Sequence, residues 1–78
     1  MTVDHEGKTP LYLQIAAILR DAIARGDYGP GRPIPSETHL MQEHGVARLT
    51  ARKAVRVLAK EGLVEVVQGR GAFVTEQN

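Results

Sequence analysis

The sequence contains no cysteine and no tryptophan, and its 78 residues include only one phenylalanine and two tyrosines. Without cysteine the chain can form neither disulfides nor thiolate metal sites. No apolar run approaches the roughly 18 residues that a membrane span needs, and the first residues lack the basic and apolar regions of a signal peptide. We therefore expect a cytoplasmic protein with no membrane association.

Acidic and basic residues nearly balance, but they are unevenly distributed. The formal net charge is +1, which is too small to indicate nucleic acid by itself. Five of the ten lysines and arginines lie between positions 48 and 60, and no acidic residue lies between Glu43 and Glu61. This local concentration indicates an anionic partner, with a solvated helix face as the simpler alternative.

The stretch from Gly45 to Leu63 is predicted to form one helix with two different faces. Apolar residues recur at helical three- and four-residue spacings and predict a buried stripe: Val46, Ala51, Ala54, Val55 and Leu58. Basic residues occupy the rest of the cylinder: Arg48, Arg52, Lys53, Arg56 and Lys60. Gly45 can adopt the positive φ that ends one helix and lets another start at a steep angle, as in a helix-turn-helix.

The residues before this stretch begin with an arm and a scaffold helix. Residues 1–8 show no periodicity, and we expect a flexible arm. Thr9 can cap a helix with its hydroxyl, and Pro10 fits the first helical position because no amide hydrogen is needed there. Apolar residues at helical spacing then predict a helix to about Arg25, ended by Gly26.

A second helix is predicted after a turn and an extended segment. Glycines and a proline cluster at residues 27–31, and the prolines within residues 32–35 favour a short extended edge strand. Ser36 can then cap a helix whose first turn contains Glu37, where a carboxylate complements the helix dipole. Gly45 ends this helix after two turns.

The end of the sequence predicts a β-hairpin. Residues 63–67 have the β-branched character of a strand, residues 68–71 form a turn with two glycines, and residues 72–75 form the returning strand. Residues 76–78 are expected to fray. The order helix, short strand, helix, helix, strand, strand predicts a mainly α winged helix-turn-helix, with three helices and a small β-hairpin as wing, over residues 9–75.

Several short motifs add a more specific signal. They are Pro10-Leu11-Tyr12, Gln14-Ile15, Pro30-Gly31, Pro35-Ser36-Glu37, Gly45-Val46, Gly62-Leu63, Gly69-Arg70-Gly71 and Phe73-Val74, with Arg48, Thr50, Arg52, Ala54 and Leu58 in the basic helix. Together they resemble the DNA-binding domain of the GntR family of bacterial transcription regulators, most closely the branch whose larger members carry sugar- or amine-sensing domains. The resemblance implies a sequence-specific regulator, expected to be a repressor, that binds double-stranded DNA as a homodimer on inverted half-sites with GT and AC ends.

The resemblance also implies how DNA is contacted. The helix at residues 47–61 would enter the major groove and the wing tip at residues 68–71 the minor groove. Arg48 and Arg52 lie four residues apart, hence on one helix face, and both match family positions that contact DNA. If bidentate to guanine, each arginine would contribute about 1–3 kcal/mol of discrimination between bases. These two residues are the main candidates for base recognition.

Other candidates on the helices have competing explanations. Leu49 can pack on a thymine methyl group or on the second helix, and Thr50 can contact DNA or cap its own helix. Tyr12 can reach a phosphate with its hydroxyl or can simply be a half-buried packing residue. Lys53 and Arg56 fit phosphate contacts, which position a protein without reading sequence, or they are solvated.

The start of the second helix and the residue before the basic helix bear on the same surface. In the resembling family, the positions of Glu37 and Thr38 reach the DNA backbone or orient the recognition arginines. Glu37 is expected to brace Arg52 or Lys53, with a plain helix-dipole acid as the alternative. Ala47 departs from the family, where serine is usual, so the basic helix loses a side-chain cap.

The wing supplies the last candidates. Gln68, Gly69 and Arg70 match the tip that enters the minor groove in relatives. Arg70 stands between glycines and can insert into a narrow A·T-rich groove, or it can be a plain hairpin residue. Most relatives continue beyond the position of Asn78 into an effector-binding and dimerising domain. We therefore expect no small-molecule effector site in this chain, and pairing of two copies that is weak or occurs only on DNA.

Two other functional classes compete with this interpretation. A winged helix can use its basic helix to dock a protein partner without reading DNA sequence. An enzyme is disfavoured because His5, His39 and His44 show no useful pairing, and no nucleophile or acid–base constellation accompanies them. The same reasoning predicts no metal site and no cofactor.

Overall fold

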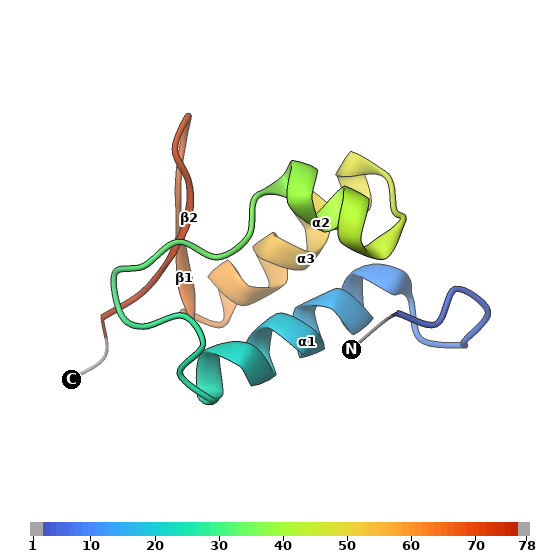
Figure 1. The fold of residues 1–78 in the computed structure, drawn as a ribbon, viewed down its shortest axis with the longest axis horizontal. Helices are drawn as coiled ribbons and strands as arrows, with labels where there is room; N and C mark the ends of the chain where they lie inside the picture. The colour runs from blue at the N-terminus through green and yellow to red at the C-terminus, as the bar shows by residue number, and fades with distance from the viewer. Residues whose placement is uncertain (1–2, 77–78) are drawn as a thin grey trace.

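Residues 3–76 are described in a computed structural model, in which three helices carry a β-hairpin at one side (Figure 1). The helices are α1 (Leu11–Ala24), α2 (Glu37–His44) and α3 (Arg48–Lys60), and the strands are β1 (Val64–Val67) and β2 (Gly71–Val74). This architecture is the predicted winged helix-turn-helix. The outermost residues of the expected arm and frayed end, 1–2 and 77–78, lie outside the described residues. No described helix is both long enough and apolar enough to cross a membrane.

The core lies between α1 and α3, and α2 and β1 also pack against α3. Ile15 of α1, Leu40 of α2 and Leu58 of α3 are fully buried, so each helix contributes one large side chain. The rest of the apolar stripe predicted within α3 is confirmed as buried, namely Ala51, Ala54 and Val55. Small alanines on this face let α1 and α3 approach closely, which is how a chain of this size builds a close-packed interior.

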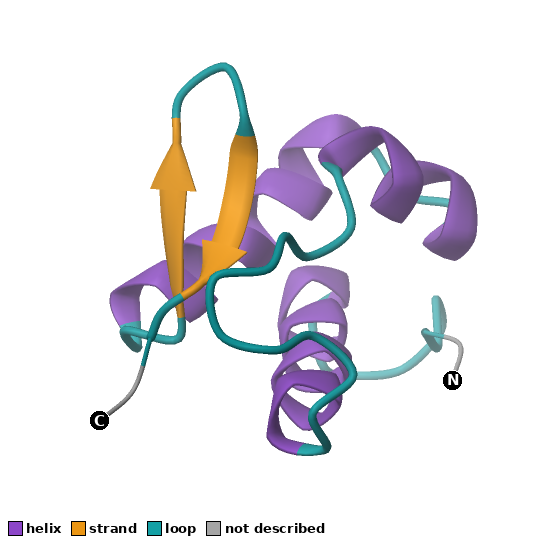
Figure 2. Ribbon diagram, turned by 60° about the vertical axis from the view of Figure 1, so that its left-hand side comes forward, coloured by secondary structure: helices purple, strands orange, loops and turns teal. Residues whose placement is uncertain are grey.

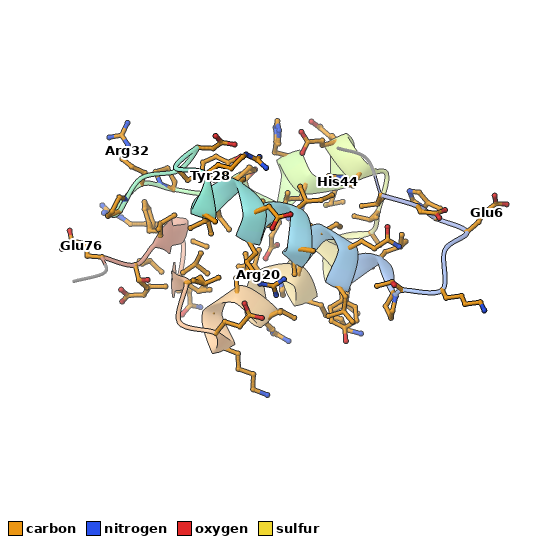
Figure 3. The ribbon with its side chains drawn as sticks, turned by 90° about the horizontal axis from the view of Figure 1, so that it is seen from below. Glu6, Arg20, Tyr28, Arg32, His44 and Glu76 are labelled. Carbon is orange, nitrogen blue, oxygen red and sulfur yellow. The ribbon has the colours of Figure 1, made fainter. Side chains whose placement is uncertain are left out.

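An ion pair joins α1 to the end of α3 at the surface. Arg20 reaches from α1 towards α3 (Figure 3), where its Nε donates to Glu61 Oε1 at 2.8 Å and its Nη2 to Oε2 at 2.6 Å. Both side chains are 40% exposed. Such a half-exposed pair contributes little to stability but fixes the two ends relative to each other.

The start of α1 differs from the prediction. Pro10 is the N-cap and not the first helical residue, because its ψ of 143° lies outside the helical region. The expected Thr9 cap is also wrong, since no side chain caps α1 and the Pro10 carbonyl accepts the amides of Leu13 and Gln14. Proline has no amide hydrogen, and neither the N-cap nor the first helical position needs one. The sequence signal therefore does not distinguish these two positions.

The turn between α2 and α3 forms largely as predicted. Ser36 is the N-cap of α2, and its hydroxyl accepts a hydrogen bond from the His39 amide at 3.1 Å. Gly45 adopts a φ of +63°, a left-handed conformation that a side chain would strain. The glycine thereby ends α2 and directs the chain into α3.

The helix α3 is shorter than the predicted helix from Gly45 to Leu63. It begins only at Arg48, because Ala47 is an extended N-cap and Val46 belongs to the turn. Val46 still packs against the core, which is why it fits the apolar periodicity. At the other end, Glu61 is the C-cap. The functional helix expected at residues 47–61 therefore corresponds to α3 with its two capping residues.

The two strands of the wing pair antiparallel, joining residues 64–67 to residues 71–74. Leu63 and Thr75, predicted as strand residues, lie outside this ladder, while Gly71 from the predicted turn belongs to it. Gly71 has a φ of +117°, which only glycine adopts readily. Compared with the prediction, β2 is therefore shifted by one residue towards the tip of the hairpin, and β1 is one residue shorter at its base.

The predicted edge strand before α2 is reduced to a single β-bridge. Pro33 forms this bridge to β2, and Figure 2 shows the segment as a loop running past the hairpin. On either side, the Ile34 amide donates to the Ala72 carbonyl at 3.0 Å and the Val74 amide to the Arg32 carbonyl at 2.8 Å. The flanking prolines remove donors that a longer ladder would need. The segment nevertheless holds the outer edge of β2.

The described part of the arm makes hydrogen bonds to the ends of two helices. The Gln14 side chain accepts from the Asp4 amide at 2.6 Å and donates to the carbonyls of Asp4 and Thr9 at 2.9 and 2.8 Å. His5 Nε2 lies 2.8 Å from the carbonyl of His44, the last residue of α2. The mobility expected of residues 1–8 stays a prediction.

Candidate nucleic-acid interface

A groove of about 700 Å³ lies between the first turns of α2 and α3 and the hairpin. The tip of the hairpin and α2 stand on the same side of the molecule, opposite α1 (Figure 1). Charged and polar side chains from three separate segments line this groove: Glu37 and Thr38 of α2, Arg48, Arg52 and Arg56 of α3, and Gln68 and Arg70 of the wing tip. The fold thus assembles most of the predicted site residues on one surface.

Glu37 is the centre of a hydrogen-bonded cluster at the groove. Its Oε2 accepts from Arg52 Nε at 3.1 Å, and its Oε1 accepts from Arg52 Nη2 and from Arg48 Nη1, both at 3.3 Å. The hydroxyl of Thr38 accepts from Arg48 Nη2 at 3.3 Å. The predicted brace is therefore made to Arg52, and to Arg48 in addition, but not to Lys53.

This cluster shifts the proton affinities of its members. The hydrogen bond from Arg52 is the largest effect and lowers the pKa of the Glu37 carboxyl; burial opposes it, and the hydrogen bond from Arg48 lowers the pKa further. The same hydrogen bond raises the pKa of Arg52. About half of each arginine side chain remains exposed, 50% for Arg48 and 46% for Arg52. Both guanidinium groups are thus held in place while facing solvent.

The other predicted residues of α3 lie around this pair. Leu49 is 56% exposed, which is unusual for a large apolar side chain, and Thr50 is half-buried. Lys53 is exposed, and its Nζ lies 5.8 Å from the ring centroid of Tyr12 at the start of α1, a cation–π distance. Tyr12 is half-buried and packs against the core, as the simpler explanation predicts, and it also lies next to a basic residue of α3, while its phosphate contact stays a prediction.

The wing tip presents its predicted residues to solvent. Gln68, Gly69 and Arg70 are all exposed and line the groove across from α3. The Arg70 amide donates to the Val67 carbonyl at 2.9 Å, which closes the tight turn. Gly69 has a φ of +81°, so the turn depends on glycine at this position.

The apolar lining of the groove was not predicted from the sequence. Val55 lines it from α3, and Val66 of β1 does so although it is 55% exposed. Val66 lies on the same strand face as buried Val64, but it projects beyond the core towards the tip. The alternation of β-branched residues in β1 was the sequence signal that could have indicated this apolar lining.

The histidines have very different environments. The side chain of His39 is 59% exposed and that of His44 only 1%, and their Nε2 atoms lie 3.7 and 3.1 Å from the two carboxylate oxygens of Glu43. The contact to His44 is close but badly aligned, so both of its ring nitrogens lack a hydrogen bond within the described chain. Across residues 3–76 no group of three or more histidine or carboxylate side chains is arranged to hold a metal ion.

A comparison with known families identifies the chain. The profile described as "Bacterial regulatory proteins, gntR family" matches residues 11–74. The chain belongs to the GntR family. This membership accounts for the set of motifs around the groove, since nearly all of them lie within the matched residues of the GntR chain.

Two relatives illustrate the family context of this GntR chain. The mannosyl-D-glycerate transport/metabolism system repressor MngR of Escherichia coli (strain K12) is 45% identical over 71 residues, which cover 91% of this chain and 30% of that protein. The transcriptional repressor NagR of Bacillus subtilis (strain 168) is 36% identical over 76 residues, which cover 97% of this chain and 31% of that protein. The GntR chain thus spans less than a third of the length of these relatives.

Solved structures confirm the winged-helix fold. The DNA-binding domain of AraR, in complex with the operator ORX1, superposes with a TM-score of 0.89 at 36% identity, covering 96% of this chain and 95% of that chain. YtrA from Sulfolobus acidocaldarius, a GntR-family transcription factor, superposes with a TM-score of 0.87 at 38% identity, covering 100% of this chain and 66% of that chain.

Proposed function

We propose that this GntR chain is the sequence-reading DNA-binding domain of a transcription regulator that acts as a repressor. The observation that carries the proposal is the placement of Arg48 and Arg52, half-exposed on one face of the first turns of α3. A helix in the major groove reads base edges with its first turns, and arginine paired with guanine is the commonest specific contact. No acidic residue lies in α3 to oppose the approach of DNA.

In this proposal α3 enters the major groove and the wing tip enters the minor groove. Arg48 and Arg52 contact bases, and Leu49 and Thr50 face the same groove. Arg70 inserts into the minor groove, where narrow A·T-rich sequence attracts arginine. The DNA backbone then occupies the groove between α3 and the hairpin, and Arg56 lines this groove.

Further contacts position the protein on the backbone. Lys53 of α3 lies close to Tyr12 at the start of α1, and both face a phosphate, while Gln68 and Gly69 enter the minor groove with Arg70 as parts of the wing tip. Such contacts carry little sequence information, but they fix the register of the protein on the duplex. Glu37 and Thr38 contribute by holding the reading arginines.

Relatives support regulation in preference to catalysis. MngR and NagR are named repressors, and the AraR domain is bound to an operator in its solved structure. We extend this class to the present chain, which then binds double-stranded DNA, catalyses no reaction and works in the cytoplasm. Two copies would form a homodimer on inverted half-sites with GT and AC ends.

The proposal is tested by selecting bound sequences from a pool of random duplexes. We expect the wild-type chain to enrich a palindrome with GT and AC half-sites. Arg48→Ala should relax selection at one position in each half-site and weaken binding by about 1–3 kcal/mol. Fluorescence titration of the enriched duplex gives the affinity, and sequencing of the bound pool gives the preference.

The matched control is Arg25→Ala, which removes the same charge from an exposed position at the end of α1, where Arg25 pairs with Asp27. We expect this variant to select the same palindrome as the wild type. If the wild type enriches no sequence, the proposal fails, and a winged helix that docks a protein partner becomes the better interpretation.

A further inference from the structure

We infer that Glu37 determines specificity by occupying hydrogen-bond donors of Arg48 and Arg52 that would otherwise bind DNA phosphates. The carboxylate thereby weakens binding to non-specific DNA and leaves recognition of bases available. This inference rests on the proposed function, because it assigns a role within the same DNA-binding surface. It predicts that Glu37 weakens non-specific binding more than specific binding.

The geometry of Arg52 separates two edges of its guanidinium group. The Nε and Nη2 edge is used by Glu37, which accepts from both atoms. Nη1 makes no hydrogen bond within the described residues, so the outer edge formed by Nη1 and Nη2 is available. A bidentate contact to guanine needs only two parallel N–H groups. Arg52 can therefore read a base without leaving Glu37.

Arg48 is held differently, through its terminal nitrogens. Nη1 donates to Glu37 and Nη2 donates to Thr38, which leaves Nε free of partners within the described residues. The two arginines together spend four N–H groups on α2. Fewer donors therefore remain for phosphates, whose several equivalent oxygens can accept a hydrogen bond from any donor that turns towards them.

The charge balance of the groove points the same way. Four arginines line the groove, and Glu37 is the single acidic residue among its lining side chains in the described chain. A phosphate bound by Arg48 or Arg52 would lie close to the Glu37 carboxylate and would be repelled by it. A guanine edge carries acceptor atoms but no net charge, so it does not suffer this repulsion. Glu37 therefore penalises phosphates more than bases.

The contacts of Glu37 are long for charge-assisted hydrogen bonds, and its carboxylate is partly exposed. Their distances of 3.1 to 3.3 Å exceed the roughly 2.7–2.9 Å of tight charge-assisted hydrogen bonds. Glu37 is 31% exposed, so water and DNA reach it. The carboxylate is thus accessible at the surface, where it repels an approaching phosphate.

The test compares Glu37→Gln with the wild type on two duplexes, the selected palindrome and a scrambled duplex of the same composition, over a range of salt. We expect Glu37→Gln to bind the scrambled duplex about five-fold more tightly, as the loss of one nearby like charge implies. The slope of log affinity against log salt should steepen by about 0.9, because one more phosphate is neutralised. The ratio of specific to non-specific affinity should fall.

Glu61→Gln is the matched control. Glu61 accepts two hydrogen bonds from Arg20, in the same Nε and Nη2 arrangement that Arg52 uses, and it does not line the groove. The substitution makes the same change in net charge. We expect its affinity ratio and salt slope to stay at the wild-type values.

A second measurement needs no variant. The NMR signal of the Arg52 Nε–H group should keep its position when the wild type is saturated with the scrambled duplex, because this group stays on Glu37. A large shift of that signal overturns the inference, as does a Glu37→Gln variant that behaves like Glu61→Gln. A Glu37→Gln variant that loses specific affinity without gaining non-specific affinity also overturns it. A wild type without preference between the duplexes refutes the proposed function itself.

Discussion

At the scale of single residues, the protonation of Glu37 is coupled to its hydrogen bonds with Arg48 and Arg52, the two arginines proposed to read bases. Hydrogen bonds from Arg52 and then Arg48 lower the pKa of its carboxyl. The ionised carboxylate is therefore favoured in the folded state over the unfolded state. Its stabilising contribution is fully present above the unfolded pKa of about 4.3 and is lost as the pH falls through the lower folded pKa.

This coupling predicts the effect of Arg52→Gln on the Glu37 titration. We expect the carboxyl carbon of Glu37, followed by NMR, to titrate below the usual range in the wild type and to move upwards in Arg52→Gln. The stability difference between the two proteins should be complete at neutral pH and should shrink as the pH falls from the unfolded pKa through the lower folded pKa. Arg25→Gln should leave the Glu37 midpoint in place. Equal midpoints in wild type and Arg52→Gln would refute the coupling.

At the scale of elements, α2 and α3 begin with the same backbone geometry but different caps. Ser36 and Ala47 are both extended N-caps, with ψ of 163° and 158°. The Ser36 hydroxyl accepts the amide three residues further on, whereas Ala47 has no acceptor to offer. The first turn of α3, which carries Arg48, therefore leaves one more amide to solvent.

The contrast predicts opposite effects at the two positions. Ser36→Ala should lower the free energy of unfolding by about 1 kcal/mol, and Ala47→Ser should raise it by about 1 kcal/mol, because a hydroxyl can then accept from the Thr50 amide. Urea denaturation followed by circular dichroism measures both changes. Ala47→Val is the control, because valine also lacks a side-chain acceptor and should leave stability close to the wild-type value. An Ala47→Ser variant no more stable than Ala47→Val would contradict the expectation.

The element boundaries show which sequence signals were sufficient. Gly45 and Ser36 were predicted in their observed roles, because a positive φ and a side-chain cap each demand a particular residue type. Pro10 was misplaced by one position because two neighbouring positions satisfy the same requirement. Val46 was assigned to the helix because periodicity reports burial, and a turn residue can be buried as well.

The sequence predicted which residues of the candidate site share one helix face, but not the contacts between different helices. The shared face of Arg48 and Arg52 follows from their spacing of four residues. The choice of Glu37 between Arg52 and Lys53 could not be made from the sequence, because it depends on the angle at which α2 meets α3. The stacking of Lys53 on Tyr12 similarly depends on where the start of α1 lies.

At the scale of the whole molecule, the exposed apolar surface is scattered. The large apolar side chains exposed within residues 3–76 are Leu13, Leu49 and Val66, one each on α1, α3 and β1. Val66 belongs to the groove that we assign to DNA. Stable dimer interfaces need a contiguous apolar patch at their centre, and these isolated side chains do not supply one.

We therefore expect the 78-residue chain to be a monomer in solution and to pair on DNA. Sedimentation velocity without DNA should give a single species of monomer mass at micromolar concentration. With the selected palindrome two copies should bind each duplex, and with a single half-site only one. A dimer in the absence of DNA would show that another surface, such as the one around Leu13, mediates pairing.

The pairing of the Arg32–Ile34 segment with β2 divides the wing into an anchored stem and an interchangeable tip. Within the stem, β2 is paired on both edges, with β1 on one side and with this segment on the other, and the ladder ends where Val67 meets Gly71. Residues 68–70 lie beyond that point and contribute no side chain to the core. Substitutions of Gln68 or Arg70, with Gly69 kept for its positive φ, would leave the stem intact. The operator preference can thus diverge through these two residues while the rest of the domain stays under the constraint of its packing.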